Sequence, residues 1–322
     1  MKPLFLYLYL LLLPPIAHAA SFDCAKAASP TEKAICSDPH LSALDGQLSI
    51  AYQIALRSAG EGDIVVRHQQ RAWLSGLNEQ CTGSQINTCI ERHQTARIHA
   101  LSNTPPFDSS RVTEYKLSQS SRSFDFVIRM FPIIQGPDDT TREGPGRVLV
   151  FAKGSATPLQ TITMDNIFAS LGKGGQPLTN TAKLYDYQGL INVGDFNFDG
   201  HEDFAIQNGN NGAYGGPSYN VYLYSPSTER FQLSQSMTDL IASTLGFFDV
   251  DTKKKLLTTL SKDGCCFHTT TAYTVVHDDP IPVSREIEDA TKSDKYVLVT
   301  TQLMINGKWQ GKSKRVPQDK TP

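Results

Sequence analysis

The spacing of apolar residues changes once along the chain, and this change constrains the fold more than any other feature. Between residues 29 and 101 apolar side chains recur at steps of three and four, as in helices that bury one face. Residues 102–110, SNTPPFDSS, interrupt this pattern with two consecutive prolines, and beyond them apolar and polar residues alternate as in strands. The sequence therefore predicts a helical domain at 20–101, a linker at 102–110 and an all-β domain at 111–322.

Helix starts are marked clearly in the first domain. Ser29 and Glu32 have the spacing of a capping box around Pro30, and Asp38 stands before Pro39 as a second N-cap. A third helix is expected to begin with Asp63 as its cap, and a fourth to contain the apolar positions Ile86, Ile90, Ile98 and Leu101.

The first 19 residues have the features of a secretory signal peptide. A basic Lys2 precedes an apolar run at residues 4–13, and small residues at Ala17 and Ala19 mark a cleavage site after Ala19. The run is too short to span a bilayer, so we expect a periplasmic protein without membrane insertion. The formal charge of −2 with no basic run makes nucleic acid an unlikely partner.

Six cysteines fit an exported protein, because disulfides form in oxidising compartments. Four of them lie in the helical domain and allow three pairings. We favour Cys24–Cys36 with Cys81–Cys89, because both bridges are local and each brackets a helical element. A metal site is disfavoured because the chain lacks CxxC spacing.

The adjacent Cys265 and Cys266 lie in the segment DGCCFH. They can form a vicinal bridge or remain two thiols. A metal site with His268 is the weaker alternative, since a fourth ligand of matching spacing is absent. The role we expect for this segment is to fix a tight turn between two strands.

The second domain is expected to be antiparallel, because short alternating segments are separated by glycine, proline, asparagine and aspartate. Asn306-Gly307 predicts a hairpin turn. Helix is expected only as a turn near Asp165 or Thr238. The sequence leaves open a sandwich and a propeller-like arrangement, because no repeat period decides between them.

The segment DFNFDGHED predicts a structural Ca²⁺ loop. Hard oxygen ligands occur at positions one, three, five, seven and nine of the loop, with a glycine at position six for the sharp turn. The candidate ligands are Asp195, Asn197, Asp199, the carbonyl of His201, and Asp203. Position twelve is Ile206 and the flanks resemble strands, so this is not an EF-hand. The alternative is an ordinary acidic β-turn, and Glu202 is expected to face solvent.

Downstream of this loop, one aromatic residue stands among glycines and asparagines in NGNNGAYGGPSYNVYLY. Tyr214 is followed by Gly215 and Gly216, which permit tight turns. In the strand after it, Tyr219, Val221 and Leu223 fall on one face, and Tyr222 and Tyr224 on the other. Tyr214 is either an anchor for a partner's cleft or a ring folded back over the domain.

Two family resemblances follow from these residues. Residues 21–101 resemble the N-terminal domain of the LprI-type lysozyme inhibitors, through FDCAKAASPTEKAICSDPHLSALD, QRAWL and CIERHQTARIHAL. Gln94 departs from the pattern, since that family usually has an aromatic residue there.

Residues 124–309 resemble periplasmic immunity proteins that act against the peptidoglycan-cleaving effectors of antibacterial type IV secretion systems. The matching segments are VGDFNFDGHEDFAI, YGGPSYNVYLY, FFDVDTKKK and GCCFH. That family is similar to inhibitors of invertebrate-type lysozyme. The resemblance implies a propeller-like or sandwich fold, a structural Ca²⁺ loop, and a tyrosine loop, here Tyr214 with Gly215 and Gly216, that enters a hydrolase cleft.

Both resemblances indicate an inhibitor, or immunity protein, whose partner is a lysozyme-like peptidoglycan hydrolase or antibacterial effector. In this hypothesis the metal loop stiffens the base of the tyrosine loop. The alternative is a Ca²⁺-dependent wall- or glycan-binding module without inhibitory activity. An enzyme is not expected, because the chain lacks HExxH, G-x-S-x-G and a metal-plus-base pair.

Overall fold

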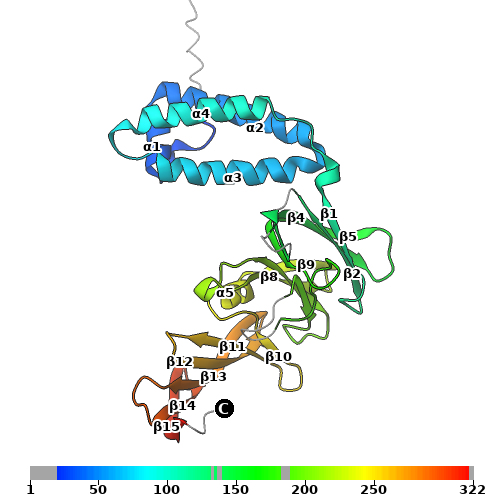
Figure 1. The fold of residues 1–322 in the computed structure, drawn as a ribbon, viewed down its shortest axis with the longest axis vertical. Helices are drawn as coiled ribbons and strands as arrows, with labels where there is room; N and C mark the ends of the chain where they lie inside the picture. The colour runs from blue at the N-terminus through cyan, green and yellow to red at the C-terminus, as the bar shows by residue number, and fades with distance from the viewer. Residues whose placement is uncertain (1–19, 132–133, 136–139, 183–188, 319–322) are drawn as a thin grey trace, which may run out of the picture. The chain divides into compact units, whose positions relative to one another are not determined.

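The computed structural model describes residues 20–131, 134–135, 140–182 and 189–318. The chain divides into two compact units, residues 1–109 and 110–322 (Figure 1). The division falls within the segment predicted as a linker. The predicted signal peptide lies outside the described residues, and no helix among those that are described is long and apolar enough to cross a membrane.

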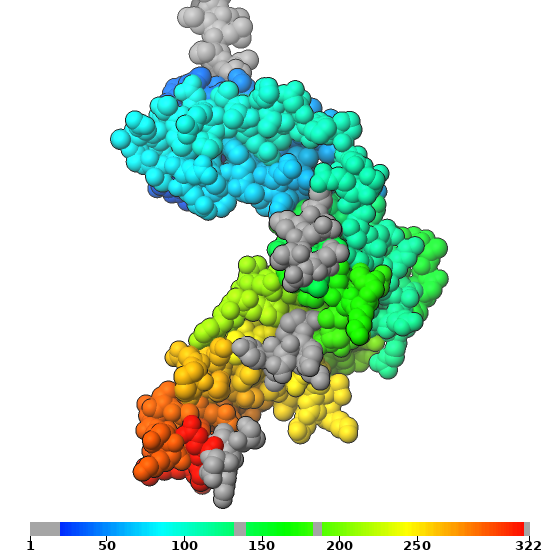
Figure 2. Space-filling model, viewed as in Figure 1, coloured from blue at the N-terminus to red at the C-terminus, as the bar shows by residue number. Residues whose placement is uncertain are grey.

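The first unit is helical, as predicted (Figure 1). Figure 2 shows its surface in blue to cyan. Its four α-helices are α1 (Pro30–Ser37), α2 (Pro39–Ala59), α3 (Asp63–Gln80) and α4 (Ile86–Ser102). Short 3-10 turns at Cys24–Lys26, Gly60–Gly62 and Gly83–Gln85 lie before or between them. Two small apolar cores, one around Leu41 and Ile90 and one around Leu48 and Leu101, hold the helices together.

Two of the predicted helix caps are present. Ser29 accepts from the backbone of Glu32 and the Glu32 carboxylate accepts from the backbone of Ser29, which is the reciprocal capping box. The side chain of Asp38 accepts from two backbone N–H groups at the start of α2. The expectation for Asp63 is wrong, because α3 begins at this residue and its N-cap is Gly62, at the end of a 3-10 turn.

All six cysteines form disulfides. Cys24 pairs with Cys36 and Cys81 with Cys89, which is the pairing that the sequence favoured. Cys265 pairs with Cys266, so the vicinal bridge is the alternative that the structure adopts. Two bridges in a unit with such small cores replace part of the stabilisation that a larger apolar core would supply.

The second unit is an all-β unit of three antiparallel sheets. The five-stranded sheet contains β1 (Thr113–Leu117), β2 (Phe124–Met130), β3 (Ile134–Gln135), β4 (Thr141–Ala152) and β5 (Pro158–Ser170). The four-stranded sheet contains β6 (Ile191–Gly194), β7 (Asp203–Gly209), β8 (Ser218–Ser225) and β9 (Arg230–Ser234). The six-stranded sheet contains β10 (Asp249–Asp251), β11 (Leu256–Lys262), β12 (Phe267–Val276), β13 (Asp279–Asp289), β14 (Tyr296–Ile305) and β15 (Lys308–Pro317).

The four-stranded sheet is the middle layer of this unit. One face packs on the five-stranded sheet, where Phe126 and Phe204 meet edge to face, so these two sheets form a sandwich-like pair. The other face packs on the helix α5 (Gln235–Ala242) and on residues of the six-stranded sheet. The two predicted faces of β8 are confirmed, since Tyr219, Val221 and Leu223 line the second core and Tyr222 the first.

Some predictions about local structure were wrong. The helical turn expected near Asp165 is wrong, because this residue lies within β5, whereas the helix expected near Thr238 is confirmed as α5. The strand β13 was not predicted, because it contains Pro280 and Pro282, which cannot donate to a ladder. In the structure both prolines pair only with β12, and β14 pairs with β13 from Ser284 onward. The predicted hairpin at Asn306-Gly307 joins β14 and β15, with positive φ at both turn residues.

Glu202 does not face solvent, contrary to the expectation from sequence. Its side chain is 14% exposed and its carboxylate accepts from the Ser121 hydroxyl and from the backbone of Arg122 and Ser123. Burial alone would raise the pKa of Glu202, but the hydrogen bonds from Ser123, Ser121 and Arg122 outweigh burial and lower the pKa to about 2. The carboxylate therefore ties the start of β7 to the turn between β1 and β2.

We expect Glu202→Gln to lower the free energy of unfolding by about 2 kcal/mol at pH 7, because an amide cannot accept all of these hydrogen bonds. The lowered pKa means that this stabilisation is present above the unfolded value of 4.5 and is lost as pH falls toward about 2. Urea unfolding of both proteins over a pH series checks this. A difference that persisted unchanged at pH 2 would contradict the assigned role.

Candidate functional site

The metal loop, residues 195–203, is folded around its own side chains. The Asp195 carboxylate accepts from the backbone of Asp199 and Gly200, at 3.0 Å each, and Asp199 accepts from the backbone of His201 at 2.8 Å. Phe198 and Gly200 adopt positive φ, which turns the chain twice within the loop. The acidic side chains therefore curve the backbone around one centre.

Asp203 ends the loop as a fully buried carboxylate. Its two oxygens accept from the backbone N–H groups of Phe196 and Tyr224, at 2.7 and 2.9 Å. Burial raises the pKa of Asp203, and the negative charge of Asp199 raises it further. The two backbone hydrogen bonds lower the pKa but do not outweigh these effects, so the pKa is about 7. A cation bound between Asp199 and Asp203 would remove this repulsion, so the donor set fits a hard divalent ion.

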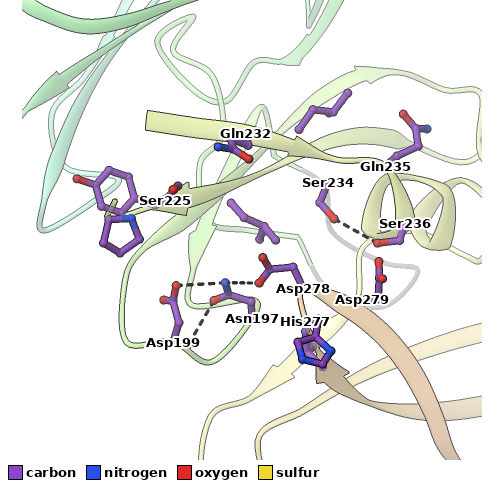
Figure 3. A pocket seen from close by; sticks show the side chains of 15 residues that line it. Asn197, Asp199, Ser225, Gln232, Ser234, Gln235, Ser236, His277, Asp278 and Asp279 are labelled. Carbon is purple, nitrogen blue, oxygen red and sulfur yellow. Dashed lines mark hydrogen bonds between the residues drawn. The ribbon is translucent and has the colours of Figure 1, made fainter. Parts of the chain in front are cut away.

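The three aspartates of the metal loop do not form a compact cluster. Within the described ranges, Asp195, Asp199 and Asp203 do not lie within 4.8 Å of one another as a set of three. Asn197 instead donates to Asp199 at 3.2 Å and to Asp278 at 2.9 Å (Figure 3). Asp278 belongs to the turn between β12 and β13, so the six-stranded sheet contacts the metal loop through this residue.

A polar cavity of about 540 Å³ lies beside this contact. The metal loop lines one side, the β12–β13 turn with His277 and Asp278 another, and β9 with the start of α5 a third (Figure 3). Asp199, Asp278 and Asp279 give it an acidic wall.

The tyrosine loop, residues 210–217, is closed by its own backbone hydrogen bonds. Gly212 donates to the carbonyl of Gly216 at 2.8 Å, and Gly215 donates to that of Gly212 at 3.1 Å. A Cβ on Gly212 would lie 2.7 Å from the carbonyl oxygen of Pro217, so only glycine fits there. Tyr214 adopts φ 58° and ψ 28°, the left-handed region that large side chains rarely occupy.

Tyr214 is exposed and yet held at its tip. Its side chain is 64% exposed, its hydroxyl accepts from the backbone N–H of Gly264 at 3.0 Å, and Lys262 Nζ lies 4.8 Å from the ring centroid. Gly264 precedes the Cys265–Cys266 bridge in the turn between β11 and β12. The ring therefore neither extends freely nor folds into the core.

The metal loop and the tyrosine loop lie at opposite ends of β7. The metal loop joins β6 to β7, and the tyrosine loop joins β7 to β8. Seven strand residues at about 3.3 Å each separate the two loops by roughly 20 Å. The expectation that the metal loop directly stiffens the base of the tyrosine loop is therefore wrong, and any influence of an ion on Tyr214 must pass along β7 and β8.

Sequence reasoning did not connect Lys262 and Gly264 with Tyr214. The segment DGCCFH was singled out as a turn, but its contact with a loop 50 residues earlier depends on the tertiary packing of two sheets. The sequence indicated that both segments are unusual, but it did not predict that they contact each other.

One family model matches most of the first unit. Residues 24–101 match the family model of the lysozyme inhibitor LprI. This match confirms the first resemblance found in the sequence and covers α1 to α4. No curated protein matches the chain.

Solved structures give weaker likenesses. A Xanthomonas type IV secretion system related protein is similar at 22% identity with a TM-score of 0.49, over 63% of this chain and 98% of that chain. A putative 6-phosphogluconolactonase from Bacteroides fragilis is similar at 11% identity with a TM-score of 0.21, over 66% of this chain and 84% of that chain.

We expect Tyr214→Phe to accelerate hydrogen exchange at the Gly264 amide by about threefold or more, because the amide loses its acceptor. The matched control is Tyr222→Phe, which removes a hydroxyl that accepts from the side chain of Asn220 and not from the Gly264 amide. Residue-resolved exchange by NMR measures both. An unchanged rate in Tyr214→Phe would show that the hydroxyl does not hold the turn in solution.

Proposed function

We propose that the protein is a periplasmic inhibitor, or immunity protein, of a lysozyme-like peptidoglycan hydrolase. The observation that carries this proposal is the match of residues 24–101 to the lysozyme inhibitor LprI. The exposed and preorganised Tyr214 supports it independently, because it lies in the other unit.

In the proposed mechanism, Tyr214 fills a sugar subsite of the hydrolase. Lysozyme-like enzymes act with two acidic residues across a cleft, one of which is protonated. The Gly264 N–H occupies only an acceptor site of the Tyr214 hydroxyl, so the hydroxyl hydrogen is available to donate to a catalytic carboxylate. The ring excludes water and sugar while the hydroxyl satisfies the buried acid.

Preorganisation supports this role energetically. The loop closes on its own hydrogen bonds and its tip is held by Gly264, so less conformational entropy is lost on binding than for a free loop. Gly215 and Gly216 carry no side chains that would block close approach of the partner.

Ca²⁺ has a structural role in this proposal. Asp195, Asn197, Asp199, the His201 carbonyl and Asp203 would hold it, and the ion would supply positive charge to neighbouring carboxylates. The Asn197–Asp278 contact joins this loop to the β12–β13 turn. The ion is thus expected to stabilise that end of the β unit without contacting the partner.

We expect Tyr214→Ala to weaken inhibition at least tenfold with little change in thermal stability, because a central aromatic anchor contributes about 2 kcal/mol or more to binding. A turbidity assay of peptidoglycan lysis, run with a panel of lysozymes and bacterial effector hydrolases, measures this. The matched control is Leu303→Ala, which truncates a 54% exposed side chain of the six-stranded sheet.

The possible outcomes distinguish the tyrosine mechanism from the inhibitor function itself. Full inhibition by Tyr214→Ala would overturn the tyrosine mechanism and assign inhibition to another surface, such as the helical unit. Inhibition of no panel member by folded protein, together with retention on sacculi, would favour the wall-binding module over the inhibitor.

The raised pKa of Asp203 gives a second test. Its folded pKa of about 7 lies above the unfolded value of 3.8, so without an ion the stability that it contributes is present below about pH 4 and is lost as pH rises to about 7. We expect this loss in chelator and its disappearance in millimolar Ca²⁺, because the cation holds the carboxylate ionised. Thermal melts of wild type and Asp199→Ala over a pH series check it. Identical melts with chelator and with Ca²⁺ would contradict the metal site.

A further inference from the structure

The helical unit contains a cavity that the proposed mechanism does not use. Its volume is about 310 Å³, at the lower end of the roughly 300–1,000 Å³ typical of small-molecule sites. Aromatic and aliphatic side chains from the N-terminal segment, α2 and α3 form much of its wall, among them Phe22, Tyr52 and Trp73.

The buried polar side chains of this unit converge on the cavity. The described part of the unit has five buried polar side chains. Four of them line the cavity, namely Thr31, Asp45, Gln70 and Gln94, and the fifth, Ser42, does not. Three of these four have partners. Thr31 donates to Asn78, Asp45 accepts from the backbone of Ser21 at 2.7 Å, and Gln70 accepts from Arg97 at 2.9 Å.

Gln94 is the exception. Its side chain is fully buried, it lines the cavity, and neither its amide oxygen nor its amide nitrogen has a hydrogen-bond partner among the described residues. A buried amide with both ends unsatisfied is unfavourable unless a ligand or water pairs with it. Both amide atoms are buried in the side-chain conformation of the free protein, so an occupant of the cavity pairs with them once the side chain turns toward it.

We propose that this cavity binds an uncharged acetamido sugar, one N-acetylated monosaccharide at a time. The acetamido carbonyl accepts from Gln94 Nε2, and the hydroxyl on the neighbouring sugar carbon donates to Gln94 Oε1. The aromatic walls provide faces for the apolar side of the sugar ring. Glu32 caps α1 and Asp45 accepts from the backbone of Ser21, so both carboxylates that line the cavity already have hydrogen-bond partners.

Trp73 provides a direct readout. The chain has two tryptophans, Trp73 and Trp309, and Trp309 lies in β15 under the guanidinium of Arg285. In full-length Trp309→Phe, titration with N-acetylglucosamine is expected to change the fluorescence saturably, with a Kd on the order of 1 mM for a ligand of this size. Glucose and glucosamine, which lack the acetyl group, are expected to bind at least tenfold more weakly.

The variant test uses Gln94→Met, which keeps the length of the side chain and removes the amide. We expect a loss of binding of at least tenfold with unchanged or higher thermal stability. The matched control is Thr95→Ala, an exposed neighbour on α4, which should bind as the wild type does. Tyr214→Ala should also bind the sugar normally, so this test is independent of the proposed inhibition.

Three results would overturn the proposal. The first is the absence of a saturable change up to on the order of 50 mM sugar, which would leave a cavity filled by water. The second is undiminished binding by Gln94→Met. The third is equal binding of glucose, or stronger binding of a blocked dipeptide amide. Saturation-transfer NMR on the wild type, where the acetyl methyl should receive the most saturation, checks the pose without any variant.

Discussion

The buried carboxylate of Asp203 is the interaction on which the β unit depends most. It stands at the first residue of β7 and accepts the backbone N–H groups of Phe196 in the metal loop and Tyr224 in β8. Without it, two donors at the edge of the core would lose their acceptor. Glu202 accepts from the turn before β2, so of these two consecutive acids Asp203 holds the central sheet together and Glu202 fixes it to the five-stranded sheet.

The strand β7 runs from Asp203 to the tyrosine loop at its other end and so links the positions of the two loops. The strand is buried along most of its length between two apolar cores, so its position is strongly determined. The six-stranded sheet braces both ends of it. The β12–β13 turn contacts the metal loop through Asp278, and the β11–β12 turn contacts Tyr214 through Gly264. The candidate site therefore depends on the packing of two sheets more than on either loop alone.

The sequence predicted what local chemistry determines. Capping at Ser29 and Asp38, the two local bridges of the helical unit, the faces of β8 and the turn at Asn306-Gly307 all depend on residues close in sequence. It did not predict the burial of Glu202, whose partners lie about 80 residues earlier, or the pairing of β13, where Pro280 and Pro282 obscured a strand. The contact of Tyr214 with Gly264 and the unpaired amide of Gln94 likewise arise only after tertiary packing.

The hydrogen-bonding capacity of tyrosine explains why this residue suits a preorganised anchor. A phenol oxygen can accept and donate at the same time. In the free protein the Gly264 N–H fixes the ring through the acceptor side of its hydroxyl. Entry into an acidic cleft uses the donor side, so the anchor gains a partner without losing one. Phenylalanine would preserve the apolar surface but lose both bonds, and serine would keep the hydroxyl without reaching either group.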